Sequence, residues 1–340
     1  MSAPKIAAVA TATPRHRFDQ ATLLRMSGYG GQRAAFFSNS QIEGRYLYFD
    51  PETFTPDESV DQLNDRFRRG AVEIGAEAVR RALARAGWRP EDVDFLATTT
   101  CTGRICPSLD AQLISVLGLK PAIQRVHVGD TGCASAIVAL QQAHNHLRAF
   151  PWHRAVVVAA EICSAAYFLD DRLESAVAHA IFADGAGAIA LGAGGEGPAI
   201  VEHRTLFRPE HLSAMGFEYP GGRPRVVLSK EVRRIGAAMM KEMADLLMAS
   251  QGLKKRDIRH FVLHSAGRRV IDQARKLMDL DESQIANSRR VLQHFGNMSS
   301  ATIVFVLDEL LRAASPAPGD WGLMIALGPG FAAEGALLRW

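Results

Sequence analysis

Apolar residues along this chain recur at two spacings, one typical of amphipathic helices and one typical of buried strands. Between residues 69 and 87 the apolar positions with a helical period are Ala71, Ile74, Ala78 and Ala82. The pattern stops at Gly87, and the apolar run Phe95–Ala97 that follows predicts a buried strand. This alternation of helix and strand signals favours an α/β fold built in layers.

The second half of the chain repeats the same succession. The apolar positions of its helix are Ile235, Met239, Met243 and Leu246. The pattern ends near Gly252, and the run Phe261–Leu263 predicts the next buried strand. An aspartate precedes the strand in each unit, and these residues, Asp92 and Asp257, are 165 positions apart. That offset is nearly half of the chain.

A second repeat has almost the same offset. Gly132 and Cys133 open one predicted helix of small and apolar residues, and Gly296 and Asn297 open another, 164 positions later. Two independent repeats at one offset predict an ancient duplication, whereas the alternative is that all αβ units look alike. We therefore expect two halves, residues 1–200 and residues 201–340.

Composition and length narrow the classes of function. Of the 340 residues, 48% are apolar and 22% are charged, and the net charge of +3 is too small to indicate nucleic-acid binding. No apolar run approaches the ~20 residues of a membrane span, and the N-terminal run is too short for a signal peptide. The four cysteines form no CxxC pair. We expect a cytoplasmic protein with reduced thiols, without a metal or cofactor.

Three residues combine into a candidate catalytic site. Cys133 follows Gly132 at a predicted helix start, where free N–H groups and the helix dipole should stabilise a thiolate and lower the thiol pKa. His264 follows the strand Phe261–Leu263, and α/β folds place catalytic groups at the carboxyl ends of strands. Asn297 offers a neutral amide that can stabilise an oxyanion. A cysteine beside an imidazole is the usual activated nucleophile.

Around these residues the sequence resembles the type III polyketide synthases. The segments that carry the resemblance are Arg45–Tyr48, Thr131–Cys133, Ile181–Gly185, His264–Gln273, Gly296–Ala301, Leu307–Glu309 and Leu327–Phe331. They follow the family's order along the whole chain, and GNMSSA combined with the downstream LDE and GPG is a specific set. Fatty-acid initiating ketosynthases share the Cys-His-Asn triad, but the residues of these segments favour the type III branch.

The resemblance implies a thiolase-like, five-layered αβαβα fold, a homodimer and a decarboxylating Claisen condensation. Cys133 would accept an acyl chain as a thioester, while His264 and Asn297 would stabilise the enolate formed as CO2 leaves. Backbone N–H groups of Cys133 and of one loop near the C-terminus would hold the acyl oxyanion. The residues of that loop expected to take part are Gly328, Gly330 and Phe331.

The resemblance also implies residues of a substrate pocket. Phe182 matches a gatekeeper between the entry tunnel and the cavity, and Cys106 matches the position at which the partner subunit closes the cavity. The family's second aromatic gatekeeper has no recognisable counterpart in the divergent segment from Thr205 to Arg225. We expect Cys101 and Cys163 to be ordinary core residues.

The segment before Arg45 departs from the family. Relatives that use free coenzyme A carry three basic residues there to hold its phosphates, whereas this chain has Gln32, Ala35 and Asn39. Either Arg33 or another basic residue replaces that grip, or the acyl groups arrive on an acyl carrier protein. Carrier delivery is the pattern of the myxopyronin and corallopyronin ketosynthases, which join two carrier-bound chains before an α-pyrone closes. It is our leading prediction.

Other functions stay open on the sequence. An ordinary type III synthase would extend an acyl-CoA with malonyl-CoA, and a fatty-acid-type ketosynthase would start a chain. A cysteine hydrolase would release a free acid, and an acyltransferase would form an ester or amide without decarboxylation. A non-catalytic partner subunit would usually have lost the nucleophile, and Cys133 is present.

Overall fold

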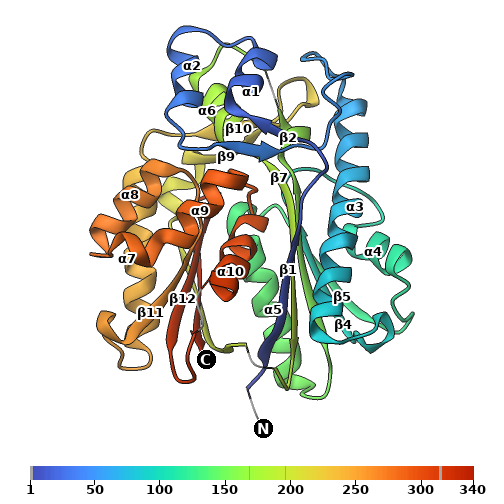
Figure 1. The fold of residues 1–340 in the computed structure, drawn as a ribbon, viewed down its shortest axis with the longest axis vertical. Helices are drawn as coiled ribbons and strands as arrows, with labels where there is room; N and C mark the ends of the chain where they lie inside the picture. Colours follow the sequence, from blue (N-terminus) through green and yellow to red (C-terminus); the bar gives the residue numbers. More distant parts are fainter. Residues whose placement is uncertain (1–2, 168, 196, 314–315) are drawn as a thin grey trace.

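The main sheet of the molecule has nine strands in the order β11-β12-β13-β8-β1-β7-β6-β4-β5 (Figure 1). The computed structural model describes residues 3–167, 169–195, 197–313 and 316–340. The strands of this sheet are β1 (Lys5–Ala12), β4 (Phe95–Thr100), β5 (Gln124–Gly129), β6 (Ala155–Ile162), β7 (Asp184–Gly192), β8 (Ala199–Phe207), β11 (Ile258–Leu263), β12 (Trp321–Gly328) and β13 (Ala332–Arg339).

Ten α-helices are found within the described ranges. They are α1 (Gln20–Ser27), α2 (Gly31–Ser38), α3 (Val60–Ala86), α4 (Leu109–Leu117), α5 (Ser135–Ala149), α6 (Leu173–Ile181), α7 (Val232–Ala249), α8 (Arg268–Leu277), α9 (Ala286–Phe295) and α10 (Ala301–Ala313). In the part of the chain that the structure describes, none of these helices is both long and apolar enough to cross a membrane.

The two ends of the main sheet face each other across a central pair of helices. In Figure 1, α5 and α10 lie between the end with β11, β12 and β13 and the end with β1, β7, β6 and β4, while α7 and α8 cover one outer face and α3 and α4 the other. One buried apolar cluster joins α5 and α10 to strands from both ends, and it includes Ile137, Val157, Val304 and Met324. These layers confirm the predicted αβαβα fold.

The two halves have the same strand pairing, as the predicted duplication requires. In the first half, β4 is parallel to β6, β6 is antiparallel to β7, and β7 is antiparallel to β1. In the second half, β11 is parallel to β12, β12 is antiparallel to β13, and β13 is antiparallel to β8. The expected boundary at residue 200 falls within β8, which also pairs with β1, so the position of that boundary stays a prediction.

The turns before β4 and β11 are alike in detail. Oδ2 of Asp92 accepts the N–H of Arg89 at 2.8 Å, and Oδ2 of Asp257 accepts the N–H of Lys254 at 2.8 Å. The helix before the first turn, α3, begins earlier than the apolar pattern indicated because Ser59 caps it. The short side-chain bond that closes each turn explains why an aspartate occurs at the same place in both halves.

A smaller layer covers one end of the five layers, at the top of Figure 1. It contains α1, α2 and α6 and two short sheets, which pair β2 (Arg17–Asp19) with β3 (Gly44–Tyr46) and β9 (Met215–Glu218) with β10 (Arg225–Leu228). Arg45 of β3 is fully buried, and its guanidinium donates to the carbonyl oxygens of His179 and Phe182 and to the side chain of Gln20. The N-terminal Arg-Tyr motif thus fixes the backbone at Phe182.

Candidate active site

Cys133 lies in a short turn, Gly132–Ala134, that leads into α5. Gly132 has a φ of 61°, and a Cβ atom there would lie 2.0 Å from Cδ of Pro329. Glycine is therefore required on both conformational and steric grounds. The close approach brings the Cys133 turn against the loop that follows β12.

Asn297 occupies the corresponding place before α10. Its backbone N–H donates to the Ile181 carbonyl and its carbonyl accepts the N–H of Ala183, both at 2.8 Å, so it lies beside Phe182. Its side-chain Oδ1 accepts the N–H of Ser299 at 2.9 Å, and Nδ2 donates to the Ala266 carbonyl at 3.1 Å. The side chain is thus held at both ends, which fixes the direction of its second N–H.

His264 follows β11 directly, as predicted. Its backbone N–H donates to the carbonyl of Ile325 in β12 at 2.9 Å, and its side chain is only 1% exposed. Neither ring nitrogen has a hydrogen-bond partner among the described residues. Burial lowers the pKa of His264 to about 4, so the imidazole is neutral at physiological pH. A neutral ring carries one N–H donor and one acceptor nitrogen, and buried groups of this kind are usually hydrogen-bonded. An unpaired buried ring is therefore a candidate for binding a substrate.

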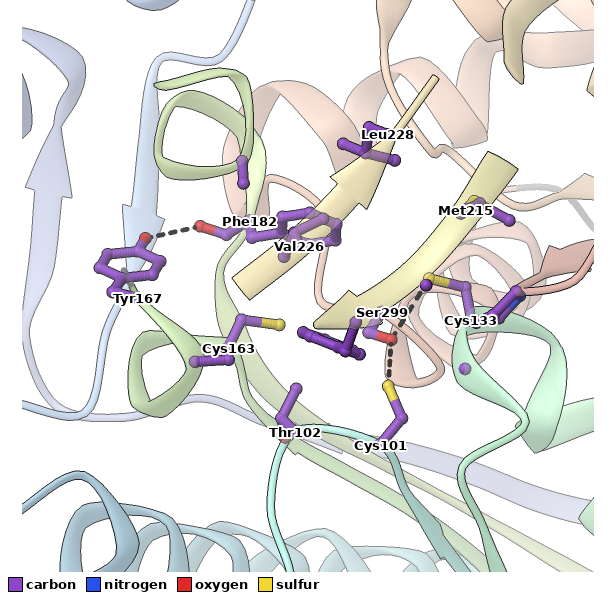
Figure 2. A pocket seen from close by; sticks show the side chains of 16 residues that line it. Cys101, Thr102, Cys133, Cys163, Tyr167, Phe182, Met215, Val226, Leu228 and Ser299 are labelled. Carbon is purple, nitrogen blue, oxygen red and sulfur yellow. Dashed lines mark hydrogen bonds between the residues drawn. The ribbon is translucent and has the colours of Figure 1, made fainter. Parts of the chain in front are cut away.

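Hydrogen bonds link Asn297 to the segment after His264 and, through Ser299, to Cys133. Among the described residues no hydrogen bond joins the His264 ring to either of the other two, and neither His264 nor Asn297 lines the cavity beside Cys133. Asn297 contacts the carbonyl of Ala266, two residues after His264, and it holds the N–H of Ser299. The Ser299 hydroxyl lies 3.3 Å from Sγ of Cys133, a contact visible in Figure 2. Ser299 was not among the predicted site residues, although it is part of the GNMSSA segment. Its φ of 49° is unusual for a residue with a side chain and is a further sign of a constrained site.

The protonation state of Cys133 differs from the prediction. Burial raises the pKa of the Cys133 thiol to about 12, and the hydrogen bond with Ser299 offsets this only in part. The predicted lowering of this pKa by the helix start was wrong, because removal of the thiolate from water outweighs it here. The resting site therefore holds a thiol and a neutral imidazole, and the thiol must lose its proton when it attacks.

A pocket opens beside Cys133 (Figure 2). Phe182 lines it, as the gatekeeper prediction requires, although the gatekeeper role itself stays a prediction. Cys101 and Cys163 line it as well. Cys163 is buried in the core as predicted, whereas Cys101 is only half-buried, so its assignment as an ordinary core residue was wrong. Sγ of Cys101 lies 3.1 Å from the Ser299 hydroxyl, on the other side from Cys133.

The β9–β10 pair contributes another side of the pocket, including an aromatic ring. Phe217 of β9 lines the cavity, within the segment where the sequence offered no second aromatic gatekeeper. No sequence pattern marked this position, because Phe217 lies in a short strand of a divergent segment. Its contribution depends on how that strand folds over the site.

The loop after β12 packs against the turn that carries Cys133, but not all of the loop's N–H groups are free. Pro329 lines the pocket, and a Cβ atom on Gly328 would lie 2.7 Å from the carbonyl oxygen of Thr131. The N–H of Gly330 donates to the carbonyl of Met215 at 3.2 Å, which removes it from the expected oxyanion donors. Phe331 is fully buried. The oxyanion role of the Cys133 N–H and of the rest of this loop stays a prediction.

A buried carboxylate lies next to the pocket and was missed by sequence reasoning. Glu161, in β6, accepts hydrogen bonds from the hydroxyls of Thr100 (3.1 Å), Thr102 (2.8 Å) and Ser300, and from the N–H of Cys101 (3.0 Å). Burial raises its pKa. The only sequence signal was a charged residue in an otherwise apolar strand. These bonds fix the wall that carries Cys101.

Two predicted features lie away from this pocket. Cys106 is exposed and does not line the cavity of its own chain, so its role toward a partner subunit stays a prediction. Gln32 and Ala35 lie in α2 and Asn39 follows it. Arg33, the expected substitute for the missing basic residues, is already bound to Asp171 through the aspartate side chain and backbone carbonyl.

Known families match both halves of the chain. Residues 47–195 match the model of the N-terminal domain of chalcone and stilbene synthases. Residues 248–340 match the model of the C-terminal part of 3-oxoacyl-[acyl-carrier-protein] synthase III. The predicted site residues are divided between these ranges, with Cys133 in the first and His264 and Asn297 in the second.

Individual relatives extend over the whole chain. The 3,5-dihydroxyphenylacetyl-CoA synthase of Streptomyces toyocaensis is 33% identical over 99% of this chain and 90% of its own. The 1,3,6,8-tetrahydroxynaphthalene synthase of Streptomyces peucetius is 30% identical over 98% of this chain and 93% of its own. The crystal structure of PKS-I from the brown alga Ectocarpus siliculosus superposes with a TM-score of 0.92, at 28% identity, over 100% of this chain and 98% of that one.

Proposed function

Because this chain belongs to the type III polyketide synthases, acyltransferases with a thiolase-like fold, we propose that it condenses a coenzyme A-bound acyl starter with malonyl-CoA through an acyl group held on Cys133. The names of the relatives favour this route over the carrier-bound route that the sequence suggested. The observation that carries the proposal is the buried, neutral and unpartnered His264 ring beside a rigidly held Asn297.

The first half-reaction loads Cys133. The thiol gives up its proton, the sulfur attacks the thioester carbonyl, and the coenzyme A thiol leaves with a proton. With a pKa of about 4, the His264 ring is too weak a base to hold the proton of a thiol whose pKa is about 12, so this proton goes to solvent and the thiolate fraction sets the loading rate. The N–H of Cys133 itself stabilises the oxyanion.

The second half-reaction forms the carbon–carbon bond. The malonyl thioester loses CO2, and the negative charge that develops on its thioester oxygen is held by N–H donors of His264 and Asn297. The resulting enolate carbon attacks the acyl carbonyl on Cys133. The Cys133 sulfur leaves and takes up a proton, and the product is a β-ketoacyl thioester. Neutral donors suit this step because they stabilise the enolate without protonating it.

The test separates the two half-reactions. With malonyl-CoA and an acyl-CoA, the protein should show an acyl adduct on Cys133 by intact-protein mass spectrometry and should release CO2. His264→Gln should abolish CO2 release while leaving the fold intact, as checked by circular dichroism. A free acid with no CO2 would instead indicate a cysteine hydrolase, and an ester or amide product an acyltransferase.

One observation favours a second route, in which carrier-bound chains are joined and an α-pyrone closes. The region of α2 offers Gln32, Ala35 and Asn39, and its one arginine is bound to Asp171. A weak phosphate grip disfavours free coenzyme A. Supplying the same acyl group on coenzyme A and on an acyl carrier protein would decide between the routes. Loading at least tenfold faster from the carrier protein would support the second route, and equal loading would reject it.

We also propose that the active unit is a homodimer in which Cys106 of each chain closes the cavity of the other. The exposed position of Cys106, outside the cavity of its own chain, is compatible with this role. Sedimentation should give twice the mass of one chain. Cys106→Trp should then change the product length, whereas a monomer with unchanged products would contradict the proposal.

A further inference from the structure

We infer that the pocket beside Cys133 accepts an unsubstituted hydrocarbon acyl chain and rejects acyl chains that carry a hydroxyl or a charge. This inference rests on the proposed function, since it concerns the acyl group that Cys133 holds. It names a substrate class from the chemistry of the pocket walls.

The walls are built from hydrocarbon and sulfur. Figure 2 shows Cys133 and Tyr167 on opposite sides of the pocket, so an acyl chain on Cys133 extends toward Tyr167. The apolar side chains that line the pocket include Cys163, Ala166, Ala178, Met215, Val226 and Leu228. Among the described residues that line the pocket, none is an acid, a base or an amide.

The hydroxyls that line the pocket are already engaged within the protein. Thr102 donates to Glu161 at 2.8 Å and accepts the N–H of Ile162 at 2.9 Å. Tyr167 donates to the carbonyl of Phe182 at 3.1 Å and accepts from Arg45 at 3.4 Å. Each of these two hydroxyls thus has a donor and an acceptor partner.

The third hydroxyl, of Ser299, lies between two thiols. It is 3.3 Å from Sγ of Cys133 and 3.1 Å from Sγ of Cys101 (Figure 2). A polar group on a substrate would therefore have to displace an existing bond or remain without a partner. Either result costs free energy, because the group leaves water without compensation.

An apolar chain meets no such cost. Each methylene that moves from water to this wall makes the free energy of binding more favourable, and the wall loses no hydrogen bond. A hydroxyl added to the same chain should slow loading by roughly 10- to 100-fold, the range in which hydrophobic pockets discriminate against such analogues. A carboxylate should slow it further, because a buried charge without a partner is more costly than a hydroxyl.

The test measures loading of Cys133 from pantetheine thioesters, which avoids any dependence on the phosphate grip or on a carrier protein. A series of saturated acyl chains gives the best length, and that chain is then compared with its ω-hydroxy and ω-carboxy analogues. Intact-protein mass spectrometry follows the adduct with time. We expect loading of the saturated chain to exceed that of both analogues. Equal or faster loading of either analogue would overturn the inference.

A matched pair of variants tests whether the wall is responsible. Val226→Thr replaces a methyl group of the wall with a hydroxyl of nearly equal size, whereas Val227, its neighbour in β10, is not among the pocket residues. Val226→Thr should reduce the preference for the saturated chain over its ω-hydroxy analogue by several-fold, and Val227→Thr should not. An unchanged preference in a folded Val226→Thr protein would contradict the inference.

The outcomes also distinguish this inference from the proposed function. If no thioester of any kind loads Cys133, the proposed function fails and the inference fails with it. If Cys133 loads and carbon–carbon bonds form, but polar chains load as well as apolar ones, only the inference fails.

Discussion

The starts of α5 and α10 occupy equivalent places in the two halves, yet their side chains are held very differently. Cys133 lines the pocket, and a single hydroxyl, that of Ser299, contacts its sulfur. Asn297 is 2% exposed, and both polar atoms of its side chain are bonded to backbone groups. On the proposed mechanism, one copy of a duplicated position thus keeps a group that reacts, and the other keeps a group that stays fixed.

The difference follows from the two half-reactions. A nucleophile must change its bonding, so a rigid shell of hydrogen bonds around the sulfur would oppose the chemistry. A donor that stabilises developing charge works best when its direction is set beforehand. On this proposal, the two equivalent positions of the duplicated halves have different roles.

The largest expected effect tests Cys133, the copy that reacts on the proposed mechanism. Cys133→Ala should remove the acyl adduct and reduce condensation by about 10⁴-fold or more, since the protein then has no acyl acceptor at this place. Mass spectrometry of the intact protein and of its peptides checks this. An adduct that persists in the variant, for example on Cys101, would show that the copies do not divide the roles in this way.

The next largest effect tests Asn297, whose side chain is held by two hydrogen bonds. Asn297→Asp keeps an oxygen that can accept the Ser299 N–H, but it loses the amide donor and turns an oxygen towards the Ala266 carbonyl, so circular dichroism first checks that the variant is folded. CO2 release from malonyl-CoA should fall by roughly 10²- to 10³-fold, as when one oxyanion donor is removed, while loading of Cys133 changes far less. Equal losses in loading and in CO2 release would remove the distinction between the two positions.

The pH dependence should also differ between the two half-reactions. Because the pKa of the Cys133 thiol is raised to about 12, the thiolate fraction grows about tenfold per pH unit through neutral pH, and the loading rate should rise with it. His264, with a pKa lowered to about 4, stays neutral over that range, so CO2 release should be nearly constant between about pH 6 and 9. If stopped-flow loading rates instead level off near pH 7, the pKa of Cys133 is lowered, as the sequence predicted, and the thiolate is already formed at neutral pH.

The smallest effect concerns Ser299, which contacts both Cys133 and Asn297. Ser299→Ala and Ser299→Gly both remove the hydroxyl near Cys133, and each should slow loading by about tenfold or less. Only glycine tolerates the φ of 49° without strain, so Ser299→Gly should be more stable than Ser299→Ala by about 1 kcal/mol. Urea unfolding measures that difference, and identical midpoints would show that the conformation is not maintained by strain.

The sequence was informative where a local pattern dictates a local structure. The repeated Asp92 and Asp257 turns, the Gly132 and Gly296 positions and the strand before His264 could all be read from spacing. The pKa of Cys133 could not, because it depends on how completely other segments exclude water from the sulfur. Phe217 and Cys101 were missed for a related reason, since their places on the wall come from contacts between distant segments.

The β9–β10 pair is a two-stranded sheet separate from the main sheet. It contributes Met215, Phe217, Val226 and Leu228 to the pocket. Only Met215 of these four side chains also packs against the apolar cluster that includes β11, β12 and β13. If this pocket holds the acyl group, as proposed, substitutions in one short hairpin can change which acyl group is used, while the proposed catalytic residues Cys133, His264 and Asn297 lie on other segments. The choice of substrate and the chemistry of the reaction would then depend on different parts of the chain.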